Sequence, residues 1–522
     1  MVSDARKRVA ERWSKIDYRS GIIDENGYSN KRSKPDIIDL TLSDTEEIPE
    51  TPKYRTQRPS SGVPEVPRGN CPFRIIKSDL FDSGGSKSQY FTDLNEIFND
   101  PTLHKTFLFS FQYELDFLMG HFHRNVQQIV LVAQEGTVLP PTTPQALSLA
   151  SKTLLIQFRM PPFTCHHSKL VINIYEDGAC RIFMPSSNFT HAETNYPQQV
   201  CWRSPRLRAR TNPPTVAFQQ DLIRYMDSYN LPDIQKYITP CLKNLDFEPL
   251  NDVQFIYSTP SKNYVSGLRL LAAKLSSLKQ DNDTNLTHHY LCQSSSVGNS
   301  LSKKASVNLF THLMIPILDG MIPADSKDIP ETSRLLQHYK SRSLVPYLLY
   351  PTVQEIRSCP AGWLCSGWFN FNYNRDLNHF NMLRKQFKIL YKQNGLVAPK
   401  QRGATPAHSK FYMRSSTSGP NEAPFEKLDW CVYTSANLSY SAWGKTRAKP
   451  RNYEVGILLT SRNLYCQSFA DLVYKGNSTS LPQGVTVAVP WTTSLEPYGD
   501  SDEAFCISKE YEMLDCNGRR RS

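Results

Sequence analysis

The tripeptide His-Ser-Lys occurs twice in this chain of 522 residues, and each copy is followed by Ser-x-Asn. The polar members of the two copies are His167, Lys169, Asn188, His408, Lys410 and Asn437. A lone His-x-Lys is common and usually marks a surface or structural histidine. Two copies with matching apolar flanks, 241 residues apart, are hard to obtain by chance. We therefore interpret the repeat as functional.

Two imidazoles, two ammonium groups and two amides would suit one phosphodiester if the copies met face to face. The ammonium and amide groups would bind the non-bridging oxygens. One imidazole would attack phosphorus, while the other would protonate the leaving oxygen and then activate water. No carboxylate stands at the usual places beside either motif, so neither a metal site nor another cofactor is expected. Gly444-Lys445-Thr446 resembles the end of a P-loop, but Ser439 stands where that loop requires glycine.

Strand-like and helical patterns alternate around the motifs, which favours an α/β fold. Residues 129–133 are typical of a buried strand, and residues 215–229 carry apolar side chains at helical spacing. Residues 171–175 and 181–184, joined by a Glu-Asp-Gly turn, predict a β-hairpin. Residues i and i+2 of a strand share a face, so each His should lie beside its Lys. Each Asn should then lie at the end of the return strand.

Composition indicates a folded protein of a reducing compartment. Apolar residues make up 39% of the chain, but their runs are far shorter than the ~20 residues of a membrane-spanning helix, so no membrane partner is expected. The 12 Cys show no CxxC pair and no zinc-finger spacing. Residues 1–70 hold 13 Lys/Arg and 12 Asp/Glu, so most of the net charge of +11 belongs to the body of the chain. This excess suits a polyanionic partner, although a merely soluble basic protein would show it too.

Changes in composition divide the chain into four parts. Residues 1–70 are rich in Ser, Pro and mixed charge, and we expect them to be disordered. A seam containing Pro and Ser near residue 258 separates a first domain, 71–258, from a second domain, 259–510, and each carries one copy of the motif. Residues 511–522 are expected to form a loose basic tail.

Two short signals lie in the N-terminal segment. The basic run at 31–34 could be read by nuclear import, and a nuclear location is expected. Ile37, Ile38 and Leu40 precede an acidic run and resemble a SUMO-interacting motif, in which an apolar strand would add to the edge of a partner's sheet. Short motifs of both kinds also match by chance.

The paired motifs resemble the phospholipase D superfamily, whose enzymes join two HxK motifs across a pseudo-twofold axis. Its common members carry an Asp five residues after the Lys, where this chain has Ile174 and Ser415. Each motif of this chain instead has a later Asn, and this His-Lys-Asn pattern resembles that of the type 1 tyrosyl-DNA phosphodiesterase family. Further similar segments are 71–73, 111–116, 163–167, 293–298, 434–439, 442–444 and 453–456. The resemblance covers 71–510 and implies a monomer with two similar α/β/α sandwich domains related by a pseudo-twofold axis, preceded by a disordered tail.

The resemblance also assigns roles at the catalytic centre. His167 would be the nucleophile, and His408 the general acid and later the general base. Gln199 and Glu454 would orient the two imidazoles, although the neighbouring Gln198 leaves an uncertainty of one residue. An ordinary strand-end carboxylate is the competing interpretation of Glu454. The phosphoryl oxygens would be bound by Lys169, Lys410, Asn188 and Asn437.

Contacts to DNA are implied by the same resemblance. Phe163 would stack on a base of single-stranded DNA, and a core phenylalanine is the competing interpretation. The DNA backbone would be contacted by Ser296, Gly298, Asn299 and Ser439.

The implied reaction removes a topoisomerase I-derived tyrosine or peptide from a DNA 3′ end and leaves a 3′-phosphate. Other 3′-blocking adducts would be further substrates. A phenol with a pKa of ~10 leaves more readily than an alkoxide, so the reaction would not need a metal. Two alternatives stay open. One is a phospholipase D-type enzyme that acts on phospholipids or internal phosphodiesters, and the other is an inactive scaffold that binds DNA ends or SUMO.

Overall fold

The computed structural model describes residues 37–39, 70–82, 88–277, 285–394, 402–419, 421–474 and 481–521. Most of the N-terminal segment, with the basic run at 31–34 and Leu40, lies outside the described residues. Ile37 and Ile38 belong to the short strand β1 (Ile37–Asp39), which pairs antiparallel with β8 of this chain. Among the described residues no helix is long and apolar enough to cross a membrane.

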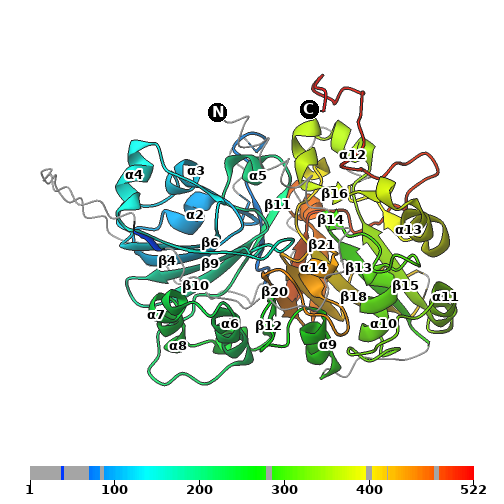
Figure 1. Ribbon diagram of the computed structural model, residues 1–522, viewed down its shortest axis with the longest axis horizontal. Helices are drawn as coiled ribbons and strands as arrows, with labels where there is room; N and C mark the ends of the chain where they lie inside the picture. Colours follow the sequence, from blue (N-terminus) through cyan, green and yellow to red (C-terminus); the bar gives the residue numbers. More distant parts are fainter. Residues whose placement is uncertain are drawn as a thin grey trace, which may run out of the picture.

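The first half of the chain is built on a nine-stranded mixed sheet of order β1-β8-β6-β4-β9-β10-β11-β2-β3. Its further strands are β2 (Phe73–Ile76), β3 (Phe91–Thr92), β4 (Leu103–Phe109), β6 (Gln128–Gln134), β8 (Thr153–Phe158), β9 (Leu170–Tyr175), β10 (Cys180–Pro185) and β11 (Gln199–Arg203). Strands β5 (Tyr113–Glu114) and β7 (Val138–Leu139) pair separately. The helices are α2 (Leu94–Phe98), α3 (Leu115–Met119), α4 (Pro144–Ala150), α5 (His191–Asn195), α6 (Ala217–Ser228), α7 (Pro232–Tyr237) and α8 (Thr239–Lys243). Figure 1 shows α2–α4 on one side of this sheet and α6–α8 on the other.

The second half is built on a seven-stranded sheet of order β12-β20-β19-β18-β13-β15-β17. These strands are β12 (Val253–Ser258), β13 (Thr287–Gln293), β15 (Leu344–Leu349), β17 (Leu390–Tyr391), β18 (Phe411–Thr417), β19 (Trp430–Thr434) and β20 (Glu454–Leu459). Two small sheets pair β14 (Ser296–Val297) with β16 (Asn370–Phe371) and β21 (Leu464–Ser468) with β22 (Val485–Val489). The α-helices are α9 (Leu268–Ser276), α10 (Ile315–Leu318), α11 (Thr332–Ser341), α12 (Val353–Ser358), α13 (Leu377–Asn381) and α14 (Tyr440–Trp443). Short 3₁₀ and π turns are η1 (Glu248–Leu250), η2 (Phe310–Met314), η3 (Gly362–Trp368), η4 (Tyr373–Arg375), η5 (Met382–Phe387), η6 (Arg402–Ala404) and η7 (Ala470–Tyr474).

The two sheets repeat one arrangement of strands. In the first half, β9 pairs antiparallel with β4 on one side and with β10 on the other, and β10 continues to β11. In the second half, β18 pairs in the same way with β13 and β19, and β19 continues to β20. Each His-Ser-Lys leads into the central strand of this unit, and each Ser-x-Asn follows the next strand. The predicted hairpin is confirmed as β9–β10, where Gly178 takes a left-handed φ of 74° in the turn.

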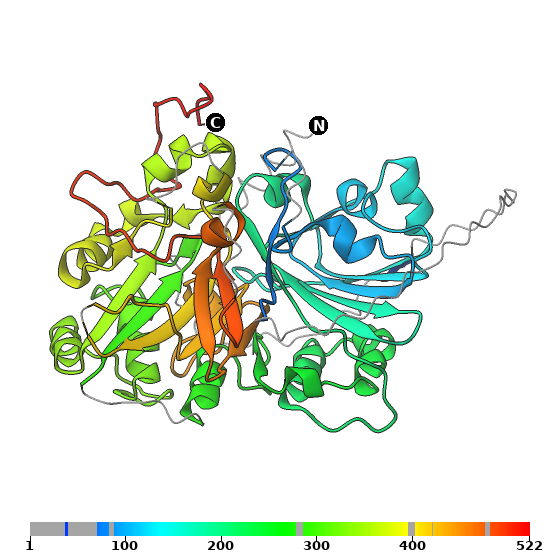
Figure 2. The same cartoon turned by 180° about the vertical axis from the view of Figure 1, so that it is seen from behind.

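A shared hydrophobic core joins the halves. Alternation along β18 sends Phe411 and Met413 into this core, while Tyr412 faces the second core beneath the helices of the second half. The hydroxyl of Tyr433 crosses the seam and donates to the carbonyls of Met184 and Val200, at 2.9 and 2.8 Å. Figure 2 shows, from behind, the segment of β20–β22 lying between the halves. The two His-Ser-Lys motifs therefore sit on two sheets that pack as one unit.

Two features of the second half differ from the expectations. Strand β12 precedes the expected boundary at residue 258, yet it pairs with β20 in the second sheet. Most of residues 511–521 are exposed, but several of them are anchored to the second half. The Asp515 carboxylate accepts hydrogen bonds from the backbone amides of Trp363 and Arg519, and the Arg521 guanidinium lies 4.9 Å from the centre of the Phe505 ring. The three arginines at 519–521 look solvated in sequence, but the cation–π contact of Arg521 and the hydrogen bonds to Asp515 anchor this segment.

Candidate active site

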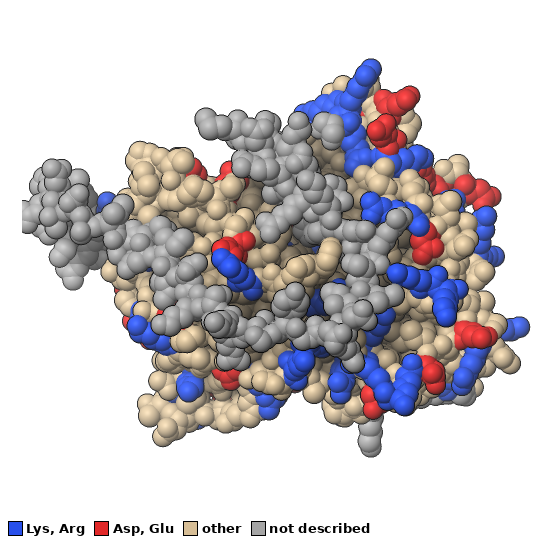
Figure 3. All heavy atoms as spheres, in the orientation of Figure 1, with Lys and Arg blue, Asp and Glu red and all other residues tan. Residues whose placement is uncertain are grey.

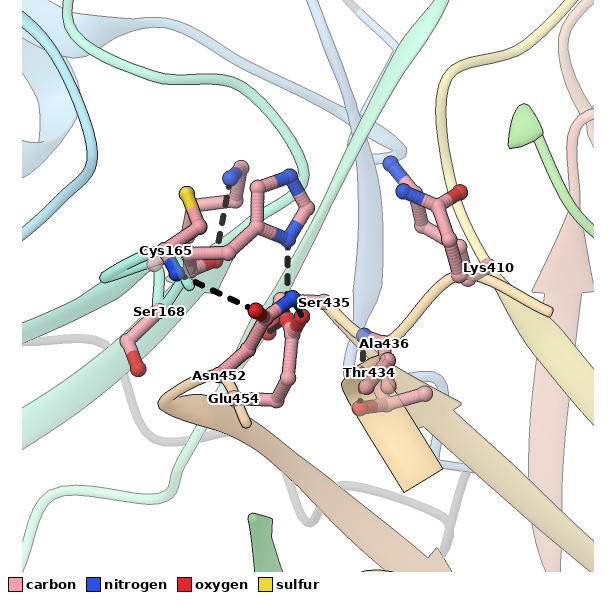
Figure 4. Close-up of polar contacts among 12 residues, drawn as sticks. Cys165, Ser168, Lys410, Thr434, Ser435, Ala436, Asn452 and Glu454 are labelled. Atoms are coloured by element: carbon pink, nitrogen blue, oxygen red, sulfur yellow. Dashed lines mark hydrogen bonds and ion pairs between the residues drawn. The ribbon is translucent and has the colours of Figure 1, made fainter. Parts of the chain in front are cut away.

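The two His-Ser-Lys segments are held together by backbone pairing across the seam. The His167 amide donates to the carbonyl of Tyr453 at 2.9 Å, just before β20. The His408 amide donates to the carbonyl of Gln198 at 2.9 Å, just before β11. The backbone amide of each histidine is thus bonded to the residue just before a strand of the opposite half, as expected for a pseudo-twofold relation. Figure 4 shows the Cys165 amide of the first half donating to the Asn452 side chain of the second, at 3.1 Å.

The motif residues precede their strands rather than lying within them. Strand β9 begins at Leu170 and β18 at Phe411, one residue after the respective Lys. Each lysine ammonium folds back and donates to the carbonyl of its own histidine, at 3.1 Å from Lys169 to His167 and at 2.5 Å from Lys410 to His408. Both lysines therefore lie beside their histidines, as expected, but a backbone contact as well as strand periodicity holds them there.

The imidazole of His167 is paired with a buried carboxylate. Its Nδ1 lies 2.8 Å from Oε2 of Glu454, which also accepts from the Ser435 hydroxyl at 2.7 Å. The other oxygen, Oε1, accepts from the Asn452 amide at 3.0 Å. Burial alone would raise the pKa of Glu454, but the charge of His167 and these hydrogen bonds hold the pKa below its usual value. Glu454 is therefore an anion that fixes a proton on Nδ1 and leaves Nε2 of His167 with its lone pair.

The imidazole of His408 meets two partners at longer range. Its Nδ1 lies 3.5 Å from the side-chain amide of Gln199 and 3.4 Å from Oε1 of Glu193. Gln198 does not take this place, because its amide is directed to the carbonyl of Arg402 at 3.4 Å. Burial lowers the pKa of His408 well below its usual value, and the charges of Lys410, Lys169 and His167 lower it further.

The serine of each Ser-x-Asn pattern positions the side chain that faces an imidazole. The Ser186 hydroxyl donates to Oε1 of Gln199 at 2.5 Å and accepts from the amide of Val200 at 2.9 Å. The Ser435 hydroxyl does the same with Glu454 and the amide of Val455, at 2.7 and 3.0 Å. Gln199 and Glu454 are the first residues of β11 and β20, so they occupy equivalent places in the repeat. The sequence repeat contained these serines, but only the structure reveals their partners.

Asn188 and Asn437 occupy equivalent places in the two motifs, but their side chains make different hydrogen bonds. Oδ1 of Asn437 accepts from the hydroxyls of Ser294 and Ser295 and from the Ser296 amide, at 3.1, 3.0 and 3.0 Å. Three donors on the oxygen direct the Nδ2 group of Asn437 towards a ligand. Asn188 instead donates through Nδ2 to Glu193 at 2.8 Å.

Glu193 is a site residue that the sequence analysis did not predict, because it does not stand at the usual places for a carboxylate beside either motif. It lies in α5, five residues after Asn188, and accepts both the backbone and the side-chain amide of that residue at 2.8 Å. A signal existed in the Thr-x-x-Glu spacing from Thr190, which caps α5. That spacing predicts a helix start rather than a catalytic neighbour.

Charge in the site is balanced by two buried cations and two buried carboxylates. Lys169 and Lys410 are 1% and 0% exposed, and burial lowers the pKa of both. Glu193 and Glu454 oppose this effect on both lysines, which keeps the buried charges paired. Among the described residues, no group of three or more His, Cys, Asp and Glu side chains is arranged to hold a metal ion.

The residues expected to contact DNA surround this centre. Phe163 is 42% exposed and has a φ of 61°, so the interpretation as a core phenylalanine is wrong. A bulky residue in the left-handed region is strained, and such strain is found mainly at functional positions. Gly298 lies against the second motif, because its amide donates to the carbonyl of Leu438 at 2.8 Å. Ser296 and Ser439 are half-buried on either side of this contact, and Asn299 is half-buried next to Gly298.

Comparison with known proteins agrees with this arrangement. A model of the tyrosyl-DNA phosphodiesterase family matches residues 74–499. The chain belongs to this family. It is 40% identical to tyrosyl-DNA phosphodiesterase 1 of Saccharomyces cerevisiae, over 97% of each chain, and 24% identical to the Drosophila melanogaster protein of that name, over 94% of this chain and 83% of the relative. The crystal structure of the yeast tyrosyl-DNA phosphodiesterase superposes with a TM-score of 0.75 at 43% identity, covering 83% of this chain and 99% of the yeast chain. The family confirms a phospholipase D-like α/β fold and a phosphodiesterase hydrolase of DNA repair.

Proposed function

We propose that this enzyme hydrolyses the 3′-phosphotyrosyl bond between a topoisomerase I-derived tyrosine or peptide and a DNA 3′ end, through a covalent phosphohistidine on His167. The observation that carries the proposal is the 2.8 Å contact between Nδ1 of His167 and the buried Glu454 carboxylate. This contact makes Nε2 the nucleophilic atom and stabilises the positive imidazole that attack creates.

In the first step, the lone pair on Nε2 of His167 forms a bond to phosphorus as the bond from phosphorus to the tyrosyl oxygen breaks. His408 gives its proton to the departing phenolate. An anionic phosphodiester between Lys169 and Lys410 offsets the two charges that lower the pKa of His408, so substrate binding favours the protonated acid. Glu193, at 3.4 Å from Nδ1, supports the same charged form.

In the second step, the neutral His408 takes a proton from water, whose oxygen attacks phosphorus. The phosphorus–nitrogen bond breaks, its electron pair returns to His167, and the DNA keeps a 3′-phosphate. Acid–base catalysis of this kind supplies about 10²–10⁴-fold in rate. The two ammonium groups and the Nδ2 amide of Asn437 would stabilise the charge on the phosphoryl oxygens in both steps, without a metal.

The exposed ring of Phe163 supports a single-stranded DNA end as the substrate, because an aromatic face stacks on any base. We propose that other 3′-blocking adducts enter the same site, since the chemistry acts at the phosphate rather than on the leaving group alone. A nuclear location, a monomeric state and SUMO binding by Ile37, Ile38 and Leu40 belong to the same proposal. Pairing of β1 with β8 would compete with SUMO for this strand.

Turnover of a 3′-phosphotyrosyl oligonucleotide in excess EDTA tests this function. We expect free tyrosine, a 3′-phosphate end and an unchanged rate on chelation. Phosphatidylcholine vesicles serve as the competing substrate. Loss of activity in EDTA, or faster release of choline than of tyrosine, would overturn the proposal.

A further inference from the structure

Two loops beside the second motif are basic and contain no acidic residue. Loop 300–307 carries Lys303 and Lys304, and loop 445–451 carries two Lys and two Arg. We call these two segments the basic loop pair. Loop 445–451 begins with the Lys and Thr of Gly444-Lys445-Thr446, which does not have the spacing of a P-loop, and the proposed catalytic chemistry gives the charges of this loop no role.

The cations of loop 445–451 are held by carbonyls and an aromatic ring. The ammonium of Lys445 donates to the carbonyl of Leu301 at 3.2 Å, which joins the two loops. Arg447 donates to the carbonyl of Asp325 at 3.3 Å, and Lys449 to the carbonyl of Pro260. Within the described part of the chain, no cation of the basic loop pair has a carboxylate oxygen within 4.0 Å. Cations gathered without counter-charges suit a polyanion.

A tight backbone presents these charges together. Gly444 has a φ of 76°, and a Cβ there would meet the carbonyl oxygen of Ala448 at 2.5 Å. The Lys445 amide closes the turn by donating to that same carbonyl at 2.7 Å. The ring of Tyr440 gathers two of the cations, with Lys445 at 5.1 Å and Arg451 at 5.0 Å from its centre. Burial lowers the pKa of Lys445, and the nearby charge of Arg451 lowers it further, which shows how closely like charges are held.

The basic loop pair adjoins the part of the site expected to receive DNA. Loop 300–307 directly follows Asn299, and loop 445–451 runs from α14, which Ser439 caps, to Asn452. Tyr440 follows Asn437 by three residues, so their Cα atoms lie within about 10 Å of each other. This distance corresponds to the length of roughly three nucleotides along a DNA strand. Figure 3 shows Lys and Arg side chains, with some Asp and Glu among them, over the region of α9 and α10 on this face.

We propose that the basic loop pair binds the phosphodiester backbone of the DNA strand a few nucleotides before its 3′ end. This inference rests on the proposed function and adds a contact that depends on strand length. Backbone phosphates fit the basic loop pair better than an acidic peptide, because the two loops follow Asn299 and α14 in the chain, next to the residues expected to contact the DNA backbone. Each contact between a cation and a phosphate of a single strand adds about 0.7 to the steepness with which log affinity falls with log salt concentration. Two such contacts therefore strengthen binding of the strand about 25-fold at 0.1 M salt.

The test uses a double variant, Arg447→Gln with Lys449→Gln, because both side chains are exposed and neither belongs to the catalytic centre. The matched control removes two exposed charges from α7 and α8, with Lys236→Gln and Lys243→Gln. Steady-state kinetics are measured on a 3′-phosphotyrosyl 12-mer (about 12 nucleotides) and on the single nucleotide ester, at several salt concentrations. The expected result is a KM for the 12-mer raised about 25-fold at 0.1 M salt and a salt slope reduced by about 1.4. The control should behave as the wild type, and the mononucleotide should be turned over equally by all three proteins.

The outcomes separate this inference from the proposed function. Wild-type enzyme that fails on the mononucleotide and the 12-mer alike rejects the function itself. Active wild type with a variant that matches the control on the 12-mer rejects the basic loop pair as a DNA contact. A wild-type KM that falls as the attached peptide becomes more acidic, at constant oligonucleotide length, with this dependence lost in the double variant, would assign the loops to the peptide instead and would also overturn the inference.

Discussion

Replacement of Glu454 by Gln tests how the site activates His167. Gln has nearly the same shape, and its one carbonyl oxygen can still accept from either Ser435 or Asn452, but it removes the negative charge 2.8 Å from Nδ1 of His167. The positive imidazole formed on attack then loses its buried counter-ion. A hydrogen bond to a charged group contributes about 1.5–3 kcal/mol, which corresponds to about 10- to 150-fold in rate.

The pH dependence gives this prediction a sign. His167 attacks only when neutral, so activity falls as the pH drops through its pKa. Burial lowers this pKa and the Glu454 charge raises it, so the Gln variant should have a lower pKa still. The acid limb of the rate profile should therefore move to lower pH in the variant, although the maximum rate falls.

Single-turnover cleavage of a 3′-phosphotyrosyl oligonucleotide between pH 4.5 and 8, values chosen around the ordinary histidine pKa of about 6.5, measures both effects. The matched control is Glu355→Gln, another buried carboxylate, which caps α12 and makes no contact with either imidazole among the described residues. This control should lose stability but keep its acid limb. A Glu454→Gln enzyme within threefold of wild type, or with an acid limb moved to higher pH, would refute the reasoning.

Three further predictions concern the supports of the site. Ser435→Ala frees the Glu454 carboxylate from a 2.7 Å hydrogen bond and should lower kcat/KM about fivefold, in line with the ~1 kcal/mol of one such bond, without changing the apparent Tm by more than a few degrees. His166 is fully buried, and burial lowers its pKa to about 3, so its imidazole binds no proton in the folded protein. In the unfolded chain it binds a proton below about pH 6.5, so the free energy of unfolding should fall by about 2 kcal/mol between pH 6.5 and 5. Urea unfolding of His166→Gln should therefore show a weaker dependence of stability on pH. Gly456→Ala would put a Cβ 2.4 Å from the Tyr433 carbonyl oxygen and should cost about 1–3 kcal/mol by thermal unfolding, whereas Gly419→Ala, which has no atom within 4 Å, should be neutral.

Sequence reasoning found the parts of the site that are repeated and chemically rare. His167, Lys169, His408 and Lys410 stood out because two copies of one pattern carry groups suited to a phosphate. The structure brings them together through backbone bridges from His166 to Tyr453 and from Gln198 to Ala407. Those bridges join residues more than 200 positions apart, and no local pattern reports contacts of that kind.

Other features were hidden because their signals have local explanations. Glu193 reads as the third residue of a short helix, and its second contact, with His408 of the other half, exists only after the halves meet. The anchoring of residues 511–521 depends on Phe505 and Asp515 finding Arg521 and Trp363, which short-range composition does not encode. Strand identity was easier to predict, because two apolar runs joined by a Glu-Asp-Gly turn are visible in the residues of β9 and β10 themselves.

Mass spectrometry of a trapped intermediate tests the central claim most directly. His408→Ala enzyme, which should form the covalent bond but hydrolyse it slowly, is mixed with a 3′-phosphotyrosyl oligonucleotide, digested and sequenced by fragmentation. The account predicts a 3′-phosphonucleotide adduct on the peptide that contains His167, and no adduct with His167→Ala. An adduct on any other residue, or release of tyrosine by His167→Ala at the wild-type rate, would contradict it.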